Sequence, residues 1–279
     1  MRTIIGNAYR NVGRLEEAEQ QLLASLETRR ALFGDRHLQI TKSLSSLGLL
    51  RLAQGREQDA EDYFQQALDL RRELLGGDSL EVAAAMMNLA TVKRIRGESD
   101  AAERLLRQAL AIRRLRLTEE HPDVAMCQFS LALVFEDRSA YGEALTLHER
   151  ALATRRAAVH EDHPDVTRSL VALGSLHLRM DQPRAAEPLL REALERDRRT
   201  LPEGHWRTAR TSRQLGSCLS ALGQYDQAEP LLISGYDGLE SALGPRNRET
   251  VEAVDALISL YDAWGRPGDA DAWRSRRNE

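Results

Sequence analysis

The sequence contains few cysteines, lysines, prolines and aromatic residues, and it lacks long apolar runs. Among its 279 residues there are only two cysteines, two lysines and eight prolines, and aromatic residues make up 5%. Cys127 and Cys218 lie in no paired motif, so we expect reduced, packed thiols rather than a disulfide or a metal site. No apolar run approaches the roughly 20 residues that would span a bilayer.

Positive and negative charges are nearly balanced along the chain. The formal net charge is −4, and acidic and basic residues are interspersed rather than gathered in the basic stripe of a nucleic-acid-binding surface. The first residues lack the long apolar core of a signal peptide. We therefore expect a cytoplasmic protein that binds neither nucleic acid nor membrane.

The strongest signal in the sequence is a repeat of 42 residues. Alanine recurs in register at Ala18, Ala60, Ala102, Ala144, Ala186, Ala228 and Ala270. Thirteen residues earlier the chain is always aliphatic, at Ile5, Leu47, Leu89, Leu131, Leu173, Leu215 and Leu257. The following residue is Gly or Ala in every copy except the last, which has Ile258. Another column contains Gly13, Gly55, Gly97, Ser139, Asp181, Gly223 and Gly265.

These columns predict two helices in every repeat. Small residues are needed where two helix axes cross closely, and the glycine column suits a turn with positive φ. Ser139 and Asp181 would adopt that conformation at some cost. In the second repeat we predict helices over residues 38–54 and 57–75, which are joined by a tight turn.

The segments between repeats also recur. His37, His121, His163 and His205 share one column, and two copies continue as His-Pro-Asp-Val. Proline suits the first helical turn, and the following aspartate complements the helix dipole. Arginine pairs near the end of the second helices suggest favourable charge at the negative end of the dipole. These pairs occupy residues 29–30, 71–72, 113–114 and 155–156.

The pattern resembles the tetratricopeptide repeat, or TPR. Repeat two shows it as Leu44, Leu47, Gly48, Gly55, Ala60, Phe64 and Ala67. The repeat length and the His-Pro-Asp-Val linkers resemble the kinesin-light-chain subtype, which is also widespread in bacteria. The resemblance implies one all-α domain over 1–279, a right-handed superhelical solenoid of about seven helix-turn-helix repeats. The expected repeats span approximately 1–36, 37–78, 79–120, 121–162, 163–204, 205–246 and 247–279.

The resemblance also implies a scaffold or adaptor that binds a protein or peptide partner and needs no cofactor. In that family the first helix of each repeat lines a concave groove. The groove residues expected here are Asn7, Leu49, Met87, Asn88, Thr91, Phe129, Leu133, Arg168, Val171, Arg179, Arg210 and Arg213. An extended or helical peptide with apolar anchors and an acidic end would suit such a surface.

Each group of groove residues has a second interpretation. Met87 and Phe129 could simply pack against the neighbouring first helix. The arginines could form a solvated face paired with nearby acids. Asn88 could bond either a peptide backbone or an adjacent repeat.

Catalytic signals are weak. His160-Glu161-Asp162-His163 resembles the spacing of metal ligands, but it lies in a linker between repeats. His-Pro-Asp is also the active tripeptide of J-domains, and helix initiation explains its occurrence in this sequence. No Ser-His-Asp arrangement stands out, so we expect no enzyme. The segment 257–267 resembles the ends of bacterial proteins with an N-terminal Ser/Thr kinase domain. The alternative function is therefore the regulatory or sensory tail of a larger signalling protein.

The first repeat lacks a polar outer face. Ile4, Ile5 and Tyr9 would be exposed there, whereas terminal repeats usually need a polar surface for solubility. We expect this edge to contact upstream residues or a second copy of the chain.

Overall fold

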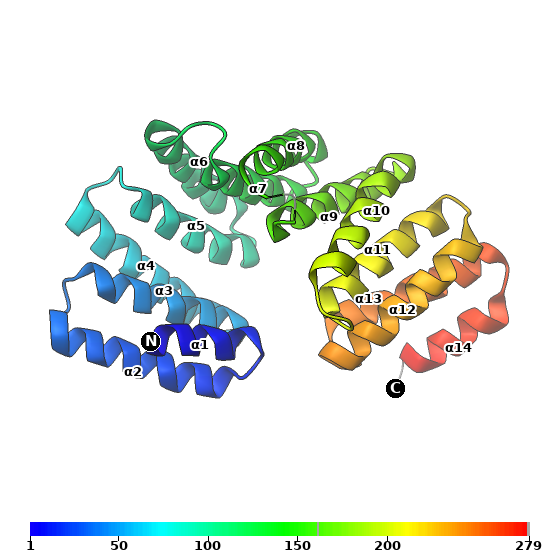
Figure 1. Ribbon diagram of the computed structural model, residues 1–279, viewed down its shortest axis with the longest axis horizontal. Helices are drawn as coiled ribbons and strands as arrows, with labels where there is room; N and C mark the ends of the chain where they lie inside the picture. Colours follow the sequence, from blue (N-terminus) through cyan, green and yellow to red (C-terminus); the bar gives the residue numbers. More distant parts are fainter. Residues whose placement is uncertain (161, 278–279) are drawn as a thin grey trace. The chain divides into compact units, whose positions relative to one another are not determined.

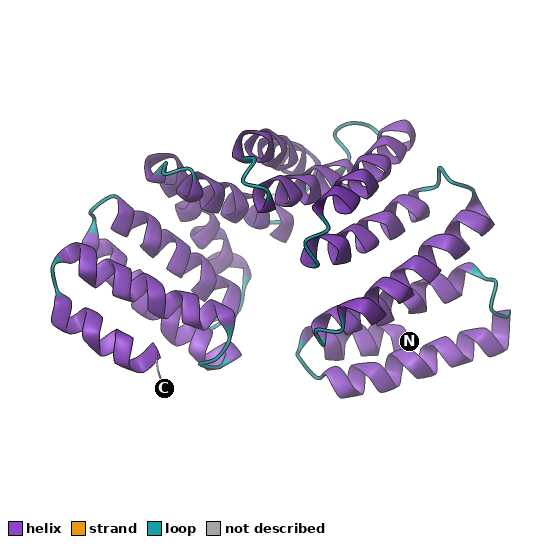
Figure 2. Ribbon diagram, turned by 180° about the vertical axis from the view of Figure 1, so that it is seen from behind, coloured by secondary structure: helices purple, strands orange, loops and turns teal. Residues whose placement is uncertain are grey.

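The protein is entirely helical over the residues that its computed structural model describes, which are 1–160 and 162–277. Fourteen helices and no strand occur in these ranges, which confirms the predicted fold class (Figures 1 and 2). The helices are α1 (Arg2–Asn11), α2 (Leu15–Phe33), α3 (Leu38–Ala53), α4 (Glu57–Leu75), α5 (Leu80–Ile95), α6 (Ser99–Arg116), α7 (Pro122–Asp137), α8 (Tyr141–Ala158), α9 (Pro164–Arg179), α10 (Pro183–Thr200), α11 (Trp206–Ala221), α12 (Tyr225–Leu243), α13 (Arg248–Trp264) and α14 (Pro267–Arg277).

The turns within repeats follow the glycine column. Each glycine of that column has a positive φ, and Ser139 and Asp181 adopt φ values of 58° and 57° in the same place. Left-handed backbone is costly for these two residues, as expected from sequence. In the second repeat, α3 and α4 fall within one residue of the predicted ranges.

The helices form two compact units. Unit 1 comprises Met1–Leu147 and unit 2 comprises His148–Glu279, so the division falls within α8. In unit 1, helices α1, α3, α5 and α7 each contact the next member of that series, and α2, α4 and α6 pack on both flanking first helices. In unit 2, α11 contacts both α9 and α13 in the same way. The first helices of each unit therefore form a continuous layer.

Close helix crossing explains the column of small residues. A Cβ atom at Gly48 would lie 2.5 Å from Cε1 of Phe64 on the paired helix, and one at Gly174 would lie 2.6 Å from Cγ of Leu190. Both partners are buried, so no side chain larger than hydrogen fits without movement. The pattern that reveals the repeat is thus a packing requirement of each helix pair.

The histidine column caps the first helices. The Nδ1 atoms of His37, His121, His163 and His205 each accept a hydrogen bond from the backbone N–H two residues later, at 3.1–3.2 Å. Ser79 and Asn247 cap α5 and α13 through their side-chain oxygens. The sequence interpretation assigned helix initiation to the proline and missed this role of the histidine.

Removing one cap should destabilise the protein measurably. His121→Ala is expected to lower the free energy of unfolding by about 1 kcal/mol, because one N-terminal N–H of α7 loses its acceptor. His121→Asn should keep most of the stability, since Asn247 performs the same task in the last repeat. Denaturant titration of both variants checks this, and equal losses would contradict the capping role.

The first arginine of the second, third and fourth pairs is a buried clamp between repeats, and Arg29 of the first pair is half-buried. Arg71 on α4 donates to Thr41 Oγ1 at 3.0 Å, to Ser45 Oγ at 3.3 Å and to the carbonyl of Glu81 on α5 at 3.0 Å. Arg113 and Arg155 likewise reach a first-turn carbonyl of the next repeat. The helix-dipole interpretation therefore does not describe these residues, because their guanidinium groups leave the end of their own helix.

The positions equivalent to Arg71 in the other repeats form what we call the clamp column. The residue type in this column changes toward the C-terminus. Burial lowers the pKa of the Arg155 guanidinium to about 10. One repeat later Asp197 takes the same place and accepts a hydrogen bond from Thr211 Oγ1 at 2.8 Å. The last member is Leu239, which is fully buried. One fixed position thus joins neighbouring repeats through arginine in the first four repeats, through aspartate in the fifth and through leucine in the sixth.

A second link between repeats joins an acid to the end of the next first helix. Glu19 on α2 accepts hydrogen bonds from Arg51 Nη2 at 2.8 Å and from Gln54 Nε2 at 3.0 Å. Glu61 pairs with Lys93 at 2.8 Å in the corresponding positions of the next repeat. Hydrogen bonding to Arg51 lowers the pKa of Glu19 to about 2.

This pKa shift predicts an acid-sensitive contribution to stability. The folded pKa of Glu19 lies below its unfolded value of 4.5, so the contribution is present above pH 4.5 and is lost as the pH falls toward 2. We expect about 1 kcal/mol after solvent screening. The difference in unfolding free energy between the wild type and Glu19→Gln should therefore be constant near pH 7 and vanish near pH 2. A difference that does not change with pH would contradict the assignment.

Candidate functional site

Four of the expected groove residues form a row across the first helices of unit 1. Asn7, Leu49, Thr91 and Leu133 are spaced by one repeat each, so they lie at the same position on α1, α3, α5 and α7. Leu49 is 37% exposed and Thr91 is exposed, whereas Asn7 and Leu133 are half-buried. We call these four residues the inner row.

Amide groups accompany the inner row. Asn7 Nδ2 donates a weak hydrogen bond of 3.4 Å to Ser46 Oγ on α3, while Asn7 Oδ1 is enclosed and accepts no hydrogen bond from the residues that the structure describes. Asn88 on α5 is half-buried. The first helices therefore present an exposed leucine and two half-buried amide side chains.

Three apolar residues expected in the groove are buried instead of exposed. Met87, Phe129 and Val171 are exposed by 8%, 9% and 7%. Met87 Sδ lies 3.5 Å from Cys127 Sγ on α7, which shows that this side chain points into the packing between repeats. The interpretation as core packing therefore describes their burial, and they offer little apolar surface to a partner.

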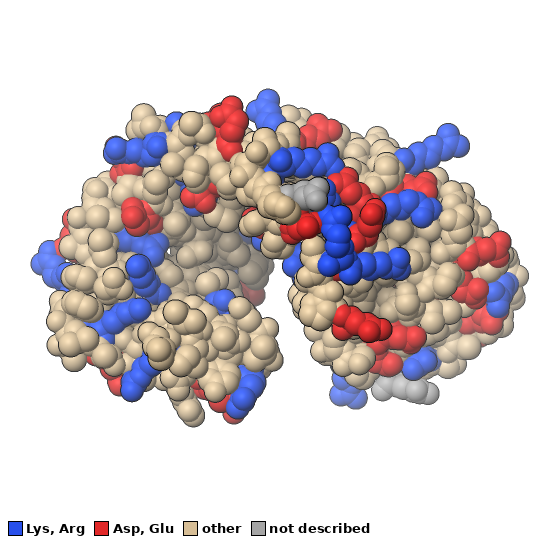
Figure 3. All heavy atoms as spheres, viewed as in Figure 1, with Lys and Arg blue, Asp and Glu red and all other residues tan. Residues whose placement is uncertain are grey.

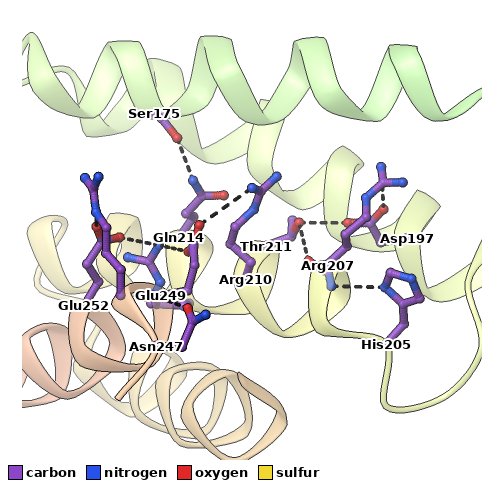
Figure 4. A network of polar contacts seen from close by, with 12 residues as sticks. Ser175, Asp197, His205, Arg207, Arg210, Thr211, Gln214, Asn247, Glu249 and Glu252 are labelled. Atoms are coloured by element: carbon purple, nitrogen blue, oxygen red, sulfur yellow. Dashed lines mark hydrogen bonds and ion pairs between the residues drawn. The ribbon is translucent and has the colours of Figure 1, made fainter. Parts of the chain in front are cut away.

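The arginines of α11 are paired within unit 2. Arg213 Nη2 lies 2.9 Å from Glu249 and 3.1 Å from Glu252 on α13, and Arg210 Nη1 lies 3.7 Å from Glu249. Figure 4 shows Arg210 directed toward Glu249 across the two helices. The carboxylates that these arginines could grip are thus supplied by the chain itself.

The arginines of α9 are placed differently. Arg168 pairs with Asp165 one turn earlier on the same helix, at 2.9 Å, and about half of its side chain remains exposed. Arg179 is exposed at the end of α9. Unit 2 therefore presents cations beside acids rather than a uniformly basic surface.

A polar network that sequence reasoning missed connects the repeats of unit 2. Gln214 Nε2 donates to Ser175 Oγ at 2.9 Å, and Thr211 Oγ1 donates to Asp197 as described above (Figure 4). Gln214 occupies the same column as Asn88, which is the one signal in the sequence that could have pointed to it. This network ties neighbouring helices together rather than opening a site.

Charges of both signs are interspersed on the surface that Figure 3 shows. Within the described ranges, no three His, Cys, Asp or Glu side chains converge as metal ligands. His160, Asp162 and His163 lie in the linker before α9, and His160 Nδ1 accepts from the Asp162 N–H; Glu161 lies outside the described residues.

Both cysteines are fully buried, as expected from sequence. Burial raises the pKa of the Cys127 thiol, and it raises that of Cys218 to about 11. Neither thiol has the exposure or the thiolate character of a nucleophile. Among the helices that the structure describes, none combines the length and apolar character needed to cross a membrane.

Solved structures with this fold include several repeat proteins. BtubC (BKLC) from P. vanneervenii matches with 24% identity over 84% of this chain and 94% of that chain, at a TM-score of 0.69. The nearly identical TPR-like repeats of a Podosopora anserina protein described as a kinesin light chain match with 23% identity over 76% and 99%, at a TM-score of 0.61. NprR in complex with its cognate peptide NprX matches with 16% identity over 99% and 76%, at a TM-score of 0.63.

Family models cover most of the sequence. No curated protein matches the chain in sequence. Two tetratricopeptide repeat models do match, one over residues 1–73, 44–115, 81–157 and 130–199, and the other over residues 171–234. These matches agree with the helix pairs, the positive-φ turns and the small-residue crossings seen in the structure. The chain therefore belongs to the tetratricopeptide repeat family.

Proposed function

We propose that the protein is a binding scaffold whose unit 1 holds a peptide or an extended protein segment along the inner row. The observation that carries the proposal is the exposed side chain of Leu49, which lies in one row with the half-buried Asn7 and Leu133 and the exposed Thr91. An apolar contact would fix one ligand side chain, and the Nδ2 group of Asn7 and the amide of Asn88 would bond the ligand backbone. NprR, which shares the fold, was solved with a bound peptide.

The spacing of the inner row suggests the form of the ligand. Packed helices lie about 8–10 Å apart, and an extended chain advances about 3.3 Å per residue. Roughly three ligand residues would therefore pass each first helix, and about 10 residues would cross all four. Apolar ligand side chains about six residues apart would meet Leu49 and Leu133.

The arginines of unit 2 contribute less to this proposal than the sequence suggested. Because Arg210 and Arg213 are already paired with Glu249 and Glu252, an acidic ligand would have to displace those carboxylates. Unit 1 offers its leucine and amides without such competition. We therefore propose the inner row of unit 1 as the principal binding surface, and no acidic anchor in the ligand.

A peptide library selected on the full chain tests the proposal. Selected peptides should carry apolar residues about six positions apart, and Leu49→Asp should weaken their binding at least about tenfold. Leu115→Asp is the matched control, because Leu115 is an exposed leucine on the second helix α6. Both variants should melt at the wild-type temperature. Equal binding by the two variants would refute the inner row as the binding surface.

A further inference from the structure

Helix α1 exposes a face whose counterparts on the later first helices are buried. Ala8 is exposed, whereas its column counterparts are all 0% exposed; these are Leu50, Val92, Val134, Leu176, Cys218 and Leu260. Ile5 is 39% exposed, and the other members of its column are buried. Met1 and Val12, which extend the same side of α1, are also exposed. The face thus has the composition of a contact between repeats, but no helix of unit 1 covers it.

A polar pair beside this face has a close counterpart in the last repeat. The Arg14 guanidinium lies 4.8 Å from the centre of the Tyr9 ring, and Arg266 lies 5.0 Å from the Tyr261 ring. Arg14 bonds Glu17 through Nε at 2.8 Å, just as Arg266 bonds Asp269 at 2.7 Å. In both places the arginine follows a glycine with positive φ, and its backbone N–H donates to the backbone carbonyl of the tyrosine at 2.9 Å.

The last repeat shows what this pair binds. Glu229, on the preceding helix α12, accepts hydrogen bonds from the Tyr261 hydroxyl at 2.7 Å and from Arg266 Nη1 at 3.0 Å. In the described part of unit 1, no carboxylate from another helix reaches the Tyr9 hydroxyl or Arg14 Nη1. The two groups are therefore arranged for an acid that a docking helix would supply.

The far end of the same face carries Met1, which suits an apolar partner residue. The clamp column faces the column of Ser43 and Cys127, as the bonds of Arg29 and Arg113 to those residues show. Met1 occupies that facing column in the first repeat, where the last repeat has Ala253. In the last repeat Ala253 lies in one buried cluster with the apolar Leu239, so the last repeat is the model for a helix that places an apolar residue near Met1.

We infer that α1 is the docking site for an amphipathic helix of a partner protein. That helix carries an acidic residue for Tyr9 and Arg14, and large apolar residues seven and ten positions later for Ile5, Ala8 and Met1. Glu229, Tyr236 and Leu239 of α12 show this spacing within the chain itself. The site lies on the terminal face of the first repeat, apart from the inner row, so it is independent of the proposed function.

A peptide with the sequence of α12, residues 225–243, is the probe. It carries Gly238→Ala to favour the helix, at a position that faces Ala209 of α11 rather than α13. Binding to the full chain is measured by fluorescence anisotropy. Ala8→Lys should weaken binding at least about tenfold and leave the melting temperature unchanged, because Ala8 is exposed. Arg14→Gln and the peptide change Glu229→Gln should each weaken binding about tenfold, and together no more than either one alone.

Three results would overturn the inference. The first is undiminished binding to Ala8→Lys. The second is a loss of binding in Arg266→Gln but not in Arg14→Gln, which would mean that the peptide displaces α12 from α13. The third is a concentration-dependent dimer in sedimentation that Ala8→Lys abolishes, which would assign the face to a second copy of the chain.

Discussion

Gly48→Val is expected to destabilise unit 1 by about 3 kcal/mol or more, which is a large part of the stability of a typical domain. The branched side chain would occupy the space of the Phe64 ring, which already lies 2.5 Å from a Cβ position at Gly48. Phe64 is 1% exposed and has no free volume to enter. Helices α3 and α4 would have to separate, and the packing of both neighbouring repeats depends on them.

A compensating change separates this packing effect from a backbone effect. In the third repeat the same two positions hold Ala90 and Leu106, so a helix pair with alanine opposite leucine occurs within this chain. Gly48→Ala alone should cost about 1–2 kcal/mol, and the double variant with Phe64→Leu should recover most of this loss. Denaturant unfolding of the four proteins measures the coupling. Simple additivity of the two changes would show that the close crossing is not the cause.

Arg71→Ala is expected to lower the free energy of unfolding by about 3 kcal/mol. The change removes three hydrogen bonds of a buried guanidinium that joins α4 to α3 and to α5. It also leaves a cavity where the aliphatic part of the side chain packed. Burial lowers the pKa of Arg71, but the group remains a cation at neutral pH.

The neighbouring arginine is the matched control. Arg72 lies beside Arg71 at the end of the same helix and is exposed, so Arg72→Ala should cost less than about 0.5 kcal/mol. If the pair acted mainly on the helix dipole, the two substitutions would have similar small effects. Thermal and denaturant unfolding of both variants decides between these interpretations. Similar losses for Arg71→Ala and Arg72→Ala would contradict the clamp.

The fold could be predicted from the sequence because its packing rules recur with the repeat. The close crossing at Gly48 and the positive φ at Ser139 are each local requirements, and each leaves a mark at a fixed spacing. The sequence reveals that the histidines recur in one column. It does not reveal that they cap helices, since histidine is an uncommon N-cap residue. Structure was needed to show that Nδ1 accepts the hydrogen bond.

The binding surface was harder to predict because it depends on which side of each first helix is covered by its neighbours. A helical period places Met87 and Leu49 on the same general side, yet one is buried and the other is exposed. The pairing of Arg213 joins residues on different repeats, and spacing alone does not show which of several acids an arginine meets. Side-chain geometry decides both cases.

The inner row of unit 1 is tested most directly by NMR of the full chain with a selected peptide. Leucine methyl groups and asparagine side-chain amides are the probes. The proposed binding mode predicts shifts at the methyls of Leu49 and Leu133 and at the side-chain amides of Asn7 and Asn88, with little change at Leu115 on α6. Shifts confined to the second helices α2, α4 and α6 would contradict it.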